Sequence, residues 1–248
     1  MDPNTTLMAD WPAAPPDLQI APGEVHVWAA NLALPSQQLA EMEAVLDDAE
    51  RGRASRFVQP LHRDRFIAAH GFLRRLLGRS LQLEPGVIQF VAGAQGKPAI
   101  DGGLEFNLAH SGDVALIALA RGRAVGVDVE QVRAMPDAEG IAARFFSADE
   151  QAALAATPAG GRQDAFFNIW TRKEAWIKAI GAGLSFPLDQ LTVSLGAGEE
   201  DCLLSAAGGP AVTTQWRLRA LSALPGLQRR RSPPAPRRNG RRGRSKRR

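Results

Sequence analysis

The chain of 248 residues has a single cysteine, Cys202, so no disulfide can form within it. A reducing compartment fits this low cysteine content, and we expect a cytoplasmic protein. Long apolar runs are also missing: the longest, "VALIALA", is far too short to cross a bilayer. The first 19 residues contain neither Lys nor Arg nor an apolar core, so they are not a secretory signal. The sequence therefore predicts no membrane partner.

Acidic residues are missing from the end of the chain, and this absence explains its basic character. The net charge is +4, yet eleven Lys and Arg residues and no acid follow Leu221. The other 19 basic residues face 26 acidic ones, so the body of the chain carries a net charge of −7. An acidic body argues against a nucleic-acid-binding core and restricts any such binding to the basic tail.

Motifs of several common enzyme classes are absent as well. The chain contains no Walker loop, GxGxxG, GxSxG or HExxH, so nucleotide hydrolases, Rossmann enzymes, serine hydrolases and zinc proteases lack their signatures. The four histidines have no metal-ligand spacing and there is no second cysteine, which disfavours zinc.

What is present predicts an α+β chain, with an α/β arrangement in two lobes. Helical periodicity covers residues 36–54, 62–79 and 164–180, and a capping box joins Ser147 to Glu150. Residues 104–120 predict two strands around a polar loop, "NLAHSGD", and residues 96–100 predict a turn. Alternating or β-branched runs predict the remaining strands: 23–32, 87–93, 124–130, 191–195, 202–206 and 212–221.

Similar element patterns in the two halves indicate two related α/β lobes. Composition divides the chain into four parts: a loose leader (1–22), an N-terminal lobe (23–124), a C-terminal lobe (125–221) and a basic disordered tail (222–248). Because both lobes belong to one chain, we expect a monomer to build the site.

The strand "AVGVDVE" (124–130) carries two carboxylates in an apolar run. Side chains alternate along a strand, so Asp128 and Glu130 share one face, roughly 7 Å apart. Two interpretations stay open. The pair faces water from a half-buried strand, or a cation offsets its repulsion.

Glu174 and Lys178 lie four residues apart on the predicted helix 164–180, so they share a face. Alone they are an ordinary surface pair. If this helix packs beside the strand, Glu174 adds a third carboxylate, and three carboxylates without soft ligands fit Mg²⁺ bound to a phosphate. His110 and Lys97 also have plain interpretations, as a loop histidine and a turn lysine.

Five segments, in order, resemble the motifs of the Sfp-type 4′-phosphopantetheinyl transferases: "GKP" (96–98), "FNLAHSGD" (106–113), "GVDVE" (126–130), "RFFSADE" (144–150) and "WTRKEAWIKAIGAGL" (170–184). The resemblance spans about residues 23–221. It implies two pseudo-symmetric lobes with the active site between them. It also implies transfer of the 4′-phosphopantetheine arm of coenzyme A to a serine of an acyl- or peptidyl-carrier protein, with release of 3′,5′-ADP. Such carriers serve fatty acid, polyketide or nonribosomal peptide biosynthesis.

The same resemblance implies roles for individual residues. Asp128, Glu130 and Glu174 match the Mg²⁺ ligands, and Glu174, directly or through a water, matches the base for the carrier serine. His110 and Lys178 match phosphate contacts, and Lys178 also matches a catalytic position. The adenine and 3′-phosphate of coenzyme A would be bound by a further group: Arg53, Arg56, Gly96, Lys97 and Pro98.

Three features depart from the family pattern. Glu50 stands where a basic residue is frequent, and Ala109 stands where serine often precedes the histidine. The basic tail replaces an Ala-rich strand; it is either an altered terminus or a segment that attracts acidic carriers. Two other functions stay open: nucleic-acid binding through the tail, and a different Mg²⁺-dependent phosphotransferase or pyrophosphatase.

Overall fold

The computed structural model describes residues 18–93, 96–183, 186–196, 203–206, 209–221 and 227–231. Its elements follow one order twice: a strand, two short helices, a helix of 22 residues, a 3-10 turn, a short hairpin and a final pair of strands. A short extra helix follows the hairpin in the second half. The mixture of helices and antiparallel sheets confirms the predicted α+β class.

The elements of the first half are β1 (Val25–Asn31), α1 (Ser36–Ala44), α2 (Asp48–Ala54), α3 (Pro60–Leu81), η2 (Pro85–Val87), β2 (Val91–Ala92), β3 (Pro98–Ala99), β4 (Leu104–Ser111) and β5 (Val114–Arg121). Those of the second half are β6 (Val127–Gln131), α4 (Ala138–Phe145), α5 (Ala148–Ala156), α6 (Ala159–Ile180), η5 (Leu188–Gln190), β7 (Leu191–Val193), β8 (Leu203–Ala206), α7 (Pro210–Gln215), β9 (Arg219–Leu221) and β10 (Leu227–Arg231).

The two main sheets repeat the same strand order. Their orders are β1-β5-β4 and β6-β10-β9, and every pair in them is antiparallel. In each sheet the last strand of its half therefore lies in the centre, between the first strand and the preceding one. The sheets meet where β6 contacts β4 and β5, so residues of both halves lie side by side at this junction.

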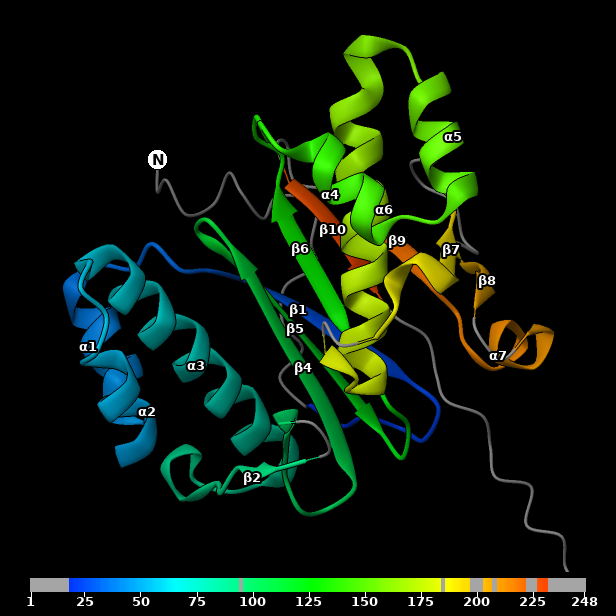
Figure 1. Cartoon of the computed structure of the whole chain (residues 1–248). Helices are drawn as coiled ribbons and strands as arrows, with labels where there is room; N and C mark the ends of the chain where they lie inside the picture. The colour runs from blue at the N-terminus through cyan, green and yellow to red at the C-terminus, as the bar shows by residue number, and fades with distance from the viewer. Residues whose placement is uncertain are drawn as a thin grey trace, which may run out of the picture.

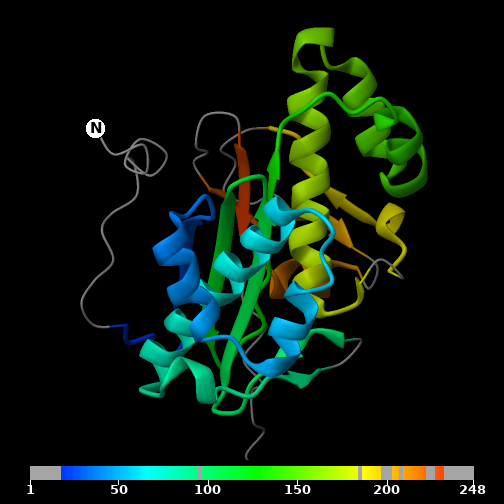
Figure 2. The ribbon, with the colours of Figure 1, turned by 90° about the vertical axis from the view of Figure 1, so that its left-hand side faces the viewer.

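Helices α3 and α6 lie on opposite sides of these strands (Figure 1). The second view, turned by 90°, places α1 and α2 in front of the sheet with α3 (Figure 2). Helix α3 buries Phe66, Ile67, Leu73 and Leu77. Helix α6 ends as predicted at Gly181, whose φ of 72° suits the left-handed cap of a helix. In the part of the chain that the structure describes, no helix is both long and apolar enough to span a membrane.

The predicted polar loop over residues 107–113 is wrong, because β4 continues to Ser111. Its pairing with β5 runs without a break to Ser111 opposite Val114, and the turn is only Gly112 and Asp113. The polar side chains in this strand obscured its period. They are accommodated because Asn107 and Ser111 form hydrogen bonds with residues of β6.

Three further predictions need correction. The helix expected over 36–54 is divided into α1 and α2, because Asp47 caps a new helix there. The strand expected over 87–93 is reduced to β2, since residues 85–87 form a 3-10 turn. In the stretch 212–221, a helix over Pro210–Gln215 precedes the short strand β9.

The leader and the tail are also more ordered than expected. Leu18 and Ile20, at the end of the predicted loose leader, are 3% and 5% exposed and pack in the core under α3. Within the predicted disordered tail, residues 227–231 form β10 between β6 and β9. Residues 1–17, 222–226 and 232–248 lie outside the described residues.

Candidate active site

Strand β6 and helix α6 bring two opposite charges together. Asp128 is 3% exposed, and Lys178 Nζ donates a hydrogen bond to its Oδ1 over 2.5 Å. The other oxygen, Asp128 Oδ2, is buried without a hydrogen-bond partner among the described residues. Leaving a buried acceptor unpaired costs roughly 1–3 kcal/mol, so this oxygen needs an explanation. A cation reaching Oδ2 would provide one.

Gly126 explains how β6 approaches α6 so closely. A side-chain carbon at this position would collide with Ala175 O and would stand 2.5 Å from Ala179 N. Only glycine permits this contact between the two backbones. Because Asp128 follows two residues later, the contact sets its carboxylate beside the helix that carries Glu174 and Lys178.

Glu130 is held by a residue of the other half. Ser111 Oγ, at the end of β4, donates to Glu130 Oε2 over 2.9 Å and accepts a hydrogen bond from Gln131 N over 3.0 Å. The sequence placed Ser111 only within the predicted polar loop "NLAHSGD". Its role depends on β4 ending beside β6, which no local pattern of residues indicates.

The charges of the predicted carboxylates act on one another. Burial raises the pKa of Asp128 to about 7; Lys178 opposes this rise, while Glu130 and Glu174 add to it. Burial also raises the pKa of Glu174, against the charge of Lys178. Burial by itself would lower the pKa of Lys178, but the three carboxylates outweigh it and the pKa rises. The tertiary structure thus gathers three acids around one lysine.

The donor set suits a hard divalent cation, because it consists of carboxylate oxygens. Oδ2 of Asp128 has no hydrogen-bond partner among the described residues, and nearby acids help to raise the pKa of this carboxyl. A bound cation would stabilise its charged form at both points. As the side chains stand, no three His, Cys, Asp or Glu residues in the described ranges are close enough together to hold a metal ion.

His110 lies on β4, within reach of the charge of Lys178. Partial burial of its ring lowers its pKa, and the charges of His70, Lys178 and Arg65 lower it further. Lys178 and Arg65 are cations close enough to act on His110, which is a suitable setting for a phosphate. Its phosphate contact stays a prediction.

Lys97 joins the two halves of the molecule. Its Nζ donates hydrogen bonds to the carbonyl oxygens of Val125, over 3.1 Å, and Ala179, over 3.2 Å. Burial lowers the pKa of Lys97, although Glu105 opposes this. The ammonium thus ties the β2–β3 hairpin to β6 and α6, a bridging role that the sequence did not reveal.

A cavity of about 380 Å³ opens between α2, α3 and β4. Its lining includes three of the five residues predicted for the adenosine end of coenzyme A: Arg53, Lys97 and Pro98. The other two are not part of the lining: Arg56 and Gly96. The cavity is also lined by Glu50, which the sequence marked as a departure from the family pattern, and by residues that sequence reasoning missed: Asp47, His70 and Asn107.

This cavity borders the strand that carries Asp128. Asn107 lines the cavity, and its Oδ1 accepts a hydrogen bond from Val127 N over 2.8 Å. One hydrogen bond between β4 and β6 therefore joins the lining of the cavity to the strand that carries Asp128 and Glu130.

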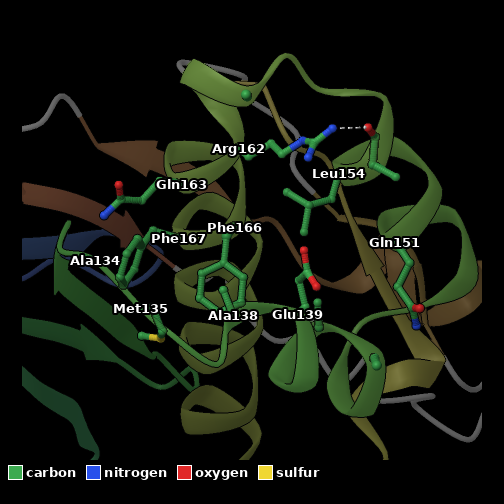
Figure 3. A pocket seen from close by; sticks show the side chains of 14 residues that line it. Ala134, Met135, Ala138, Glu139, Gln151, Leu154, Arg162, Gln163, Phe166 and Phe167 are labelled. Carbon is green, nitrogen blue, oxygen red and sulfur yellow. Dashed lines mark hydrogen bonds between the residues drawn. The ribbon is translucent and has the colours of Figure 1, made fainter.

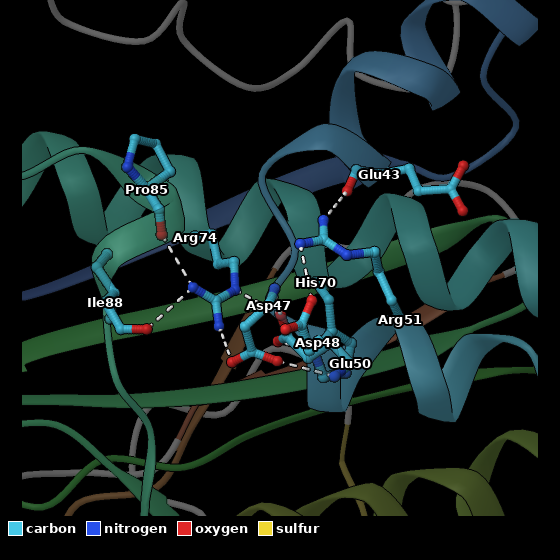
Figure 4. Close-up of polar contacts among 9 residues, drawn as sticks. All are labelled: Glu43, Asp47, Asp48, Glu50, Arg51, His70, Arg74, Pro85 and Ile88. Atoms are coloured by element: carbon cyan, nitrogen blue, oxygen red, sulfur yellow. Dashed lines mark hydrogen bonds and ion pairs between the residues drawn. The ribbon is translucent and has the colours of Figure 1, made fainter.

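Glu50 belongs to a buried cluster that we call the Arg74 clamp (Figure 4). Arg74 is fully buried; its Nε donates to Glu50 Oε2 over 2.5 Å, and its Nη2 pairs with Asp47. Its Nη1 donates to Pro85 O over 2.9 Å and to Ile88 O over 3.0 Å. Asp47 and Glu50 also form the capping box of α2. The acid at position 50 thus balances a buried guanidinium.

The second half contains an equivalent cluster, the Lys173 clamp. Lys173 is fully buried and forms an ion pair with Glu150 Oε2 over 2.6 Å. Its Nζ also donates to Leu188 O over 2.6 Å and to Leu191 O. Glu150 forms the capping box of α5 with Ser147, as the sequence predicted.

Another cavity, of about 490 Å³, lies between α4, α5 and α6 (Figure 3). Phe166, Leu154 and Met135 give it apolar walls, with Glu139 and Arg162 beside them. None of the residues predicted for the site lines it.

Comparison with known proteins agrees with this geometry. The sequence model of the 4′-phosphopantetheinyl transferase superfamily matches residues 124–223, which include β6 and α6. The 4′-phosphopantetheinyl transferase HetI of Nostoc sp. is 40% identical over 194 residues, covering 76% of this chain and 81% of HetI.

Two Bacillus proteins are similar as well. The 4′-phosphopantetheinyl transferase psf-1 of Bacillus pumilus is 32% identical, over 64% of this chain and 68% of its own length. The 4′-phosphopantetheinyl transferase Sfp of Bacillus subtilis is 33% identical, over 59% of this chain and 65% of Sfp. With its two repeated halves and its cluster of carboxylates, the chain belongs to the 4′-phosphopantetheinyl transferase family of enzymes.

Proposed function

We propose that the protein transfers the 4′-phosphopantetheine arm of coenzyme A to a serine hydroxyl of an acyl- or peptidyl-carrier protein. The serine oxygen forms a bond to the phosphorus that carries the pantetheine arm. The bond from this phosphorus to the bridging pyrophosphate oxygen breaks, and 3′,5′-ADP leaves. The observation that carries the proposal is the buried Asp128 beside Lys178, with its second oxygen unpartnered.

Asp128, Glu130 and Glu174 would hold Mg²⁺ in this reaction. The ion supplies positive charge against the pyrophosphate when it is bound. The support for these ligands is their oxygen donors and the way in which Glu130 raises the pKa of both Asp128 and Glu174. Ser111 fixes one oxygen of Glu130, so that carboxylate is positioned before any ligand arrives.

Glu174 is the candidate base for the serine hydroxyl, directly or through a water. It is half-buried, and burial raises its pKa, which makes it a stronger acceptor of a proton than an exposed glutamate. Lys178 and His110 would contact the phosphates and stabilise the charge that develops on the leaving group. Lys178 is suited to this because its pKa is raised and it stays charged.

The adenosine end of coenzyme A would occupy the cavity between α2, α3 and β4. Arg53, Lys97 and Pro98 line this cavity, and it adjoins β6 through Asn107. An extended ligand could then have its adenosine in the first half and its pyrophosphate at the junction. Arg56 and Gly96 remain predicted contacts outside the lining.

The decisive experiment is incubation of the protein with coenzyme A, Mg²⁺ and a panel of apo-carrier proteins. We expect one carrier to gain the mass of a single phosphopantetheine group, with an equal amount of 3′,5′-ADP released. Omitting the carrier should stop release, which separates this reaction from a pyrophosphatase. Chelation of Mg²⁺ should abolish transfer, and addition of the ion should restore it. Failure to modify any carrier in the panel would contradict the proposal.

A further inference from the structure

One side of β6 needs hydrogen-bond partners from beyond its own sheet. Among the described strands, β6 pairs only with β10, so its other side has no strand partner there. Backbone N–H groups alternate in direction along a strand, so those of Val127, Val129 and Gln131 point to the same side. Val127 is fully buried, and a buried N–H group without an acceptor is costly. Acceptors must therefore come from β4, the strand of the first half that contacts β6.

Side chains of β4 supply these acceptors. Asn107 Oδ1 accepts a hydrogen bond from Val127 N over 2.8 Å, and Ser111 Oγ accepts one from Gln131 N over 3.0 Å. Residues four apart along a strand share a face, and both the acceptors and the donors are four apart. The two bonds therefore hold β4 and β6 in one register, with side chains at the places where a continuous sheet would use its backbone.

The surroundings of these two bonds support the same register. Ala109 lies between Asn107 and Ser111 along β4, and it packs in one apolar cluster with Val127 and Val129. A shift of β6 by one residue would break both side-chain bonds and turn its buried valines to the opposite face. The register of β6 against the first half is therefore strongly set.

This register decides where two carboxylates of the site stand. Asp128 directly follows Val127, and Glu130 directly precedes Gln131, so both lie between the two anchored amides. Ser111 also donates to the carboxylate of Glu130. The bond from Asn107 reaches Asp128 through the backbone instead, because the amide that it anchors belongs to the preceding residue.

We propose that Asn107 is a positioning residue: by anchoring Val127 it sets the carboxylate of Asp128 at the place where it would bind Mg²⁺. The side chain acts as an acceptor, through Oδ1, and not by donating to coenzyme A, although it lines the cavity of the first half. This inference rests on the proposed function, because it assumes that Asp128 is a metal ligand.

Two substitutions distinguish the acceptor from a ligand contact. Asn107→Leu removes the acceptor with little change in volume. Asn107→Asp keeps an oxygen for Val127 N but replaces the NH₂ group by a second oxygen. If Asn107 acted by donating its NH₂ group to coenzyme A, both variants would fail alike. Asn31→Leu is the matched control, because Asn31 Oδ1 accepts a hydrogen bond from Ala33 N over 3.0 Å at the end of β1.

Hydrogen exchange of single amides, measured by NMR without substrates, tests the contact itself. Relative to the amides of β5, we expect the Val127 amide to exchange about tenfold faster in Asn107→Leu and at the wild-type rate in Asn107→Asp. Asn31→Leu should leave the exchange at Val127 unchanged. If Asn107→Leu does not fold, Asn107→Ala removes the same acceptor. Unchanged exchange at Val127 in the variant without the acceptor would overturn the proposal.

Carrier modification at saturating coenzyme A tests the consequence for the site. We expect Asn107→Leu to raise the Mg²⁺ concentration for half-maximal rate about tenfold, while Asn107→Asp and Asn31→Leu do not raise it. A rise in both Asn107 variants, or a change in the KM for coenzyme A alone, would assign the side chain to the ligand and contradict the proposal.

The two measurements separate this inference from the proposed function. Faster exchange at Val127 with an unchanged Mg²⁺ requirement would refute the positioning role of Asn107 and keep the proposed function. Faster exchange at Val127, with no carrier modified even by the wild type, would refute the proposed function and keep the contact between β4 and β6.

Discussion

The Arg74 clamp and the Lys173 clamp are the same device built twice. Each cation is the fifteenth residue of a 22-residue helix, and each pairs with the third residue of a capped short helix. Each also donates to two carbonyl oxygens, one at the start of a 3-10 turn and one just after it. The repeat therefore extends from the order of elements to individual polar contacts.

The next positions of the two long helices differ in chemistry. Helix α6 follows its clamp lysine with Glu174 and, four residues later, Lys178, both beside β6. At the equivalent positions helix α3 has Arg75, which pairs with exposed Glu41, and Arg79. The shared scaffold thus carries the proposed acid–base groups in the second half and the proposed adenosine cavity in the first.

The largest expected effect is on catalysis. Glu174→Gln should lower kcat by about 10²–10⁴-fold, because the substitution removes the proposed base and the negative charge of one proposed Mg²⁺ ligand. Arg75→Gln, at the equivalent position of α3, should leave kcat unchanged. Both are measured by the mass gain of the carrier. A folded Glu174→Gln variant with near-normal kcat would contradict the proposal that α6, unlike α3, carries a catalytic group at this position.

The two clamps should contribute similarly to the stability of the protein. Arg74→Met and Lys173→Met each leave a buried carboxylate without its cation, so each should lower the free energy of unfolding by about 3–5 kcal/mol. Urea denaturation checks this. The double variant Lys173→Met/Glu150→Leu should regain much of the lost free energy of unfolding, since no buried charge is then left unpaired. Losses below about 1 kcal/mol in the single variants would show that the clamps are not structural.

Gly126→Ala tests the contact that sets Asp128 beside the helix of Glu174 and Lys178. The new methyl group must push β6 away from Ala175 and Ala179, which should cost about 1–3 kcal/mol of stability and reduce transfer. Gly52→Ala in α2 is the control, because a side chain there meets nothing within 4 Å. Retained activity and stability in Gly126→Ala would contradict the close approach of β6 and α6.

Ser111→Ala should have the smallest effect. It removes the hydrogen bond to Glu130, worth about 0.5–1.5 kcal/mol, and leaves the carboxylate itself in place. We expect a fall in kcat/KM of about tenfold or less, with more Mg²⁺ needed for half-maximal rate. An unchanged dependence of the rate on Mg²⁺ would mean that the hydrogen bond from Ser111 does not position Glu130 for the metal.

Much of this organisation could be predicted where local rules apply. The α+β class, the second capping box and the end of α6 at Gly181 follow from periodicity and cap chemistry. The pairing of Asp128 with Glu130 follows from strand alternation. The other capping box, Asp47 with Glu50, was not predicted, because the sequence pattern indicated one continuous helix over residues 36–54.

Other features depend on contacts between distant segments. Lys97 was predicted to help bind the adenine and 3′-phosphate, yet its ammonium also bridges Val125, just before β6, and Ala179 in α6. Strand β10 was missed because the sequence "LQRRR" has no apolar period, and only pairing with β6 and β9 makes it a strand. Nothing near Glu50 in the chain indicates Arg74 or His70, each at least 20 residues away.

The sequence by itself determined which residues can carry charge, where α5 begins and α6 ends, and which family the motifs resemble. These depend on side-chain chemistry and on interactions within a few residues. Only the tertiary structure decided that Asp128 is buried against Lys178, that Ser111 supports Glu130 and that Glu50 holds His70. The reason is physical: burial and pairing depend on how β4, β6, α3 and α6 pack, and that packing is set by the whole chain.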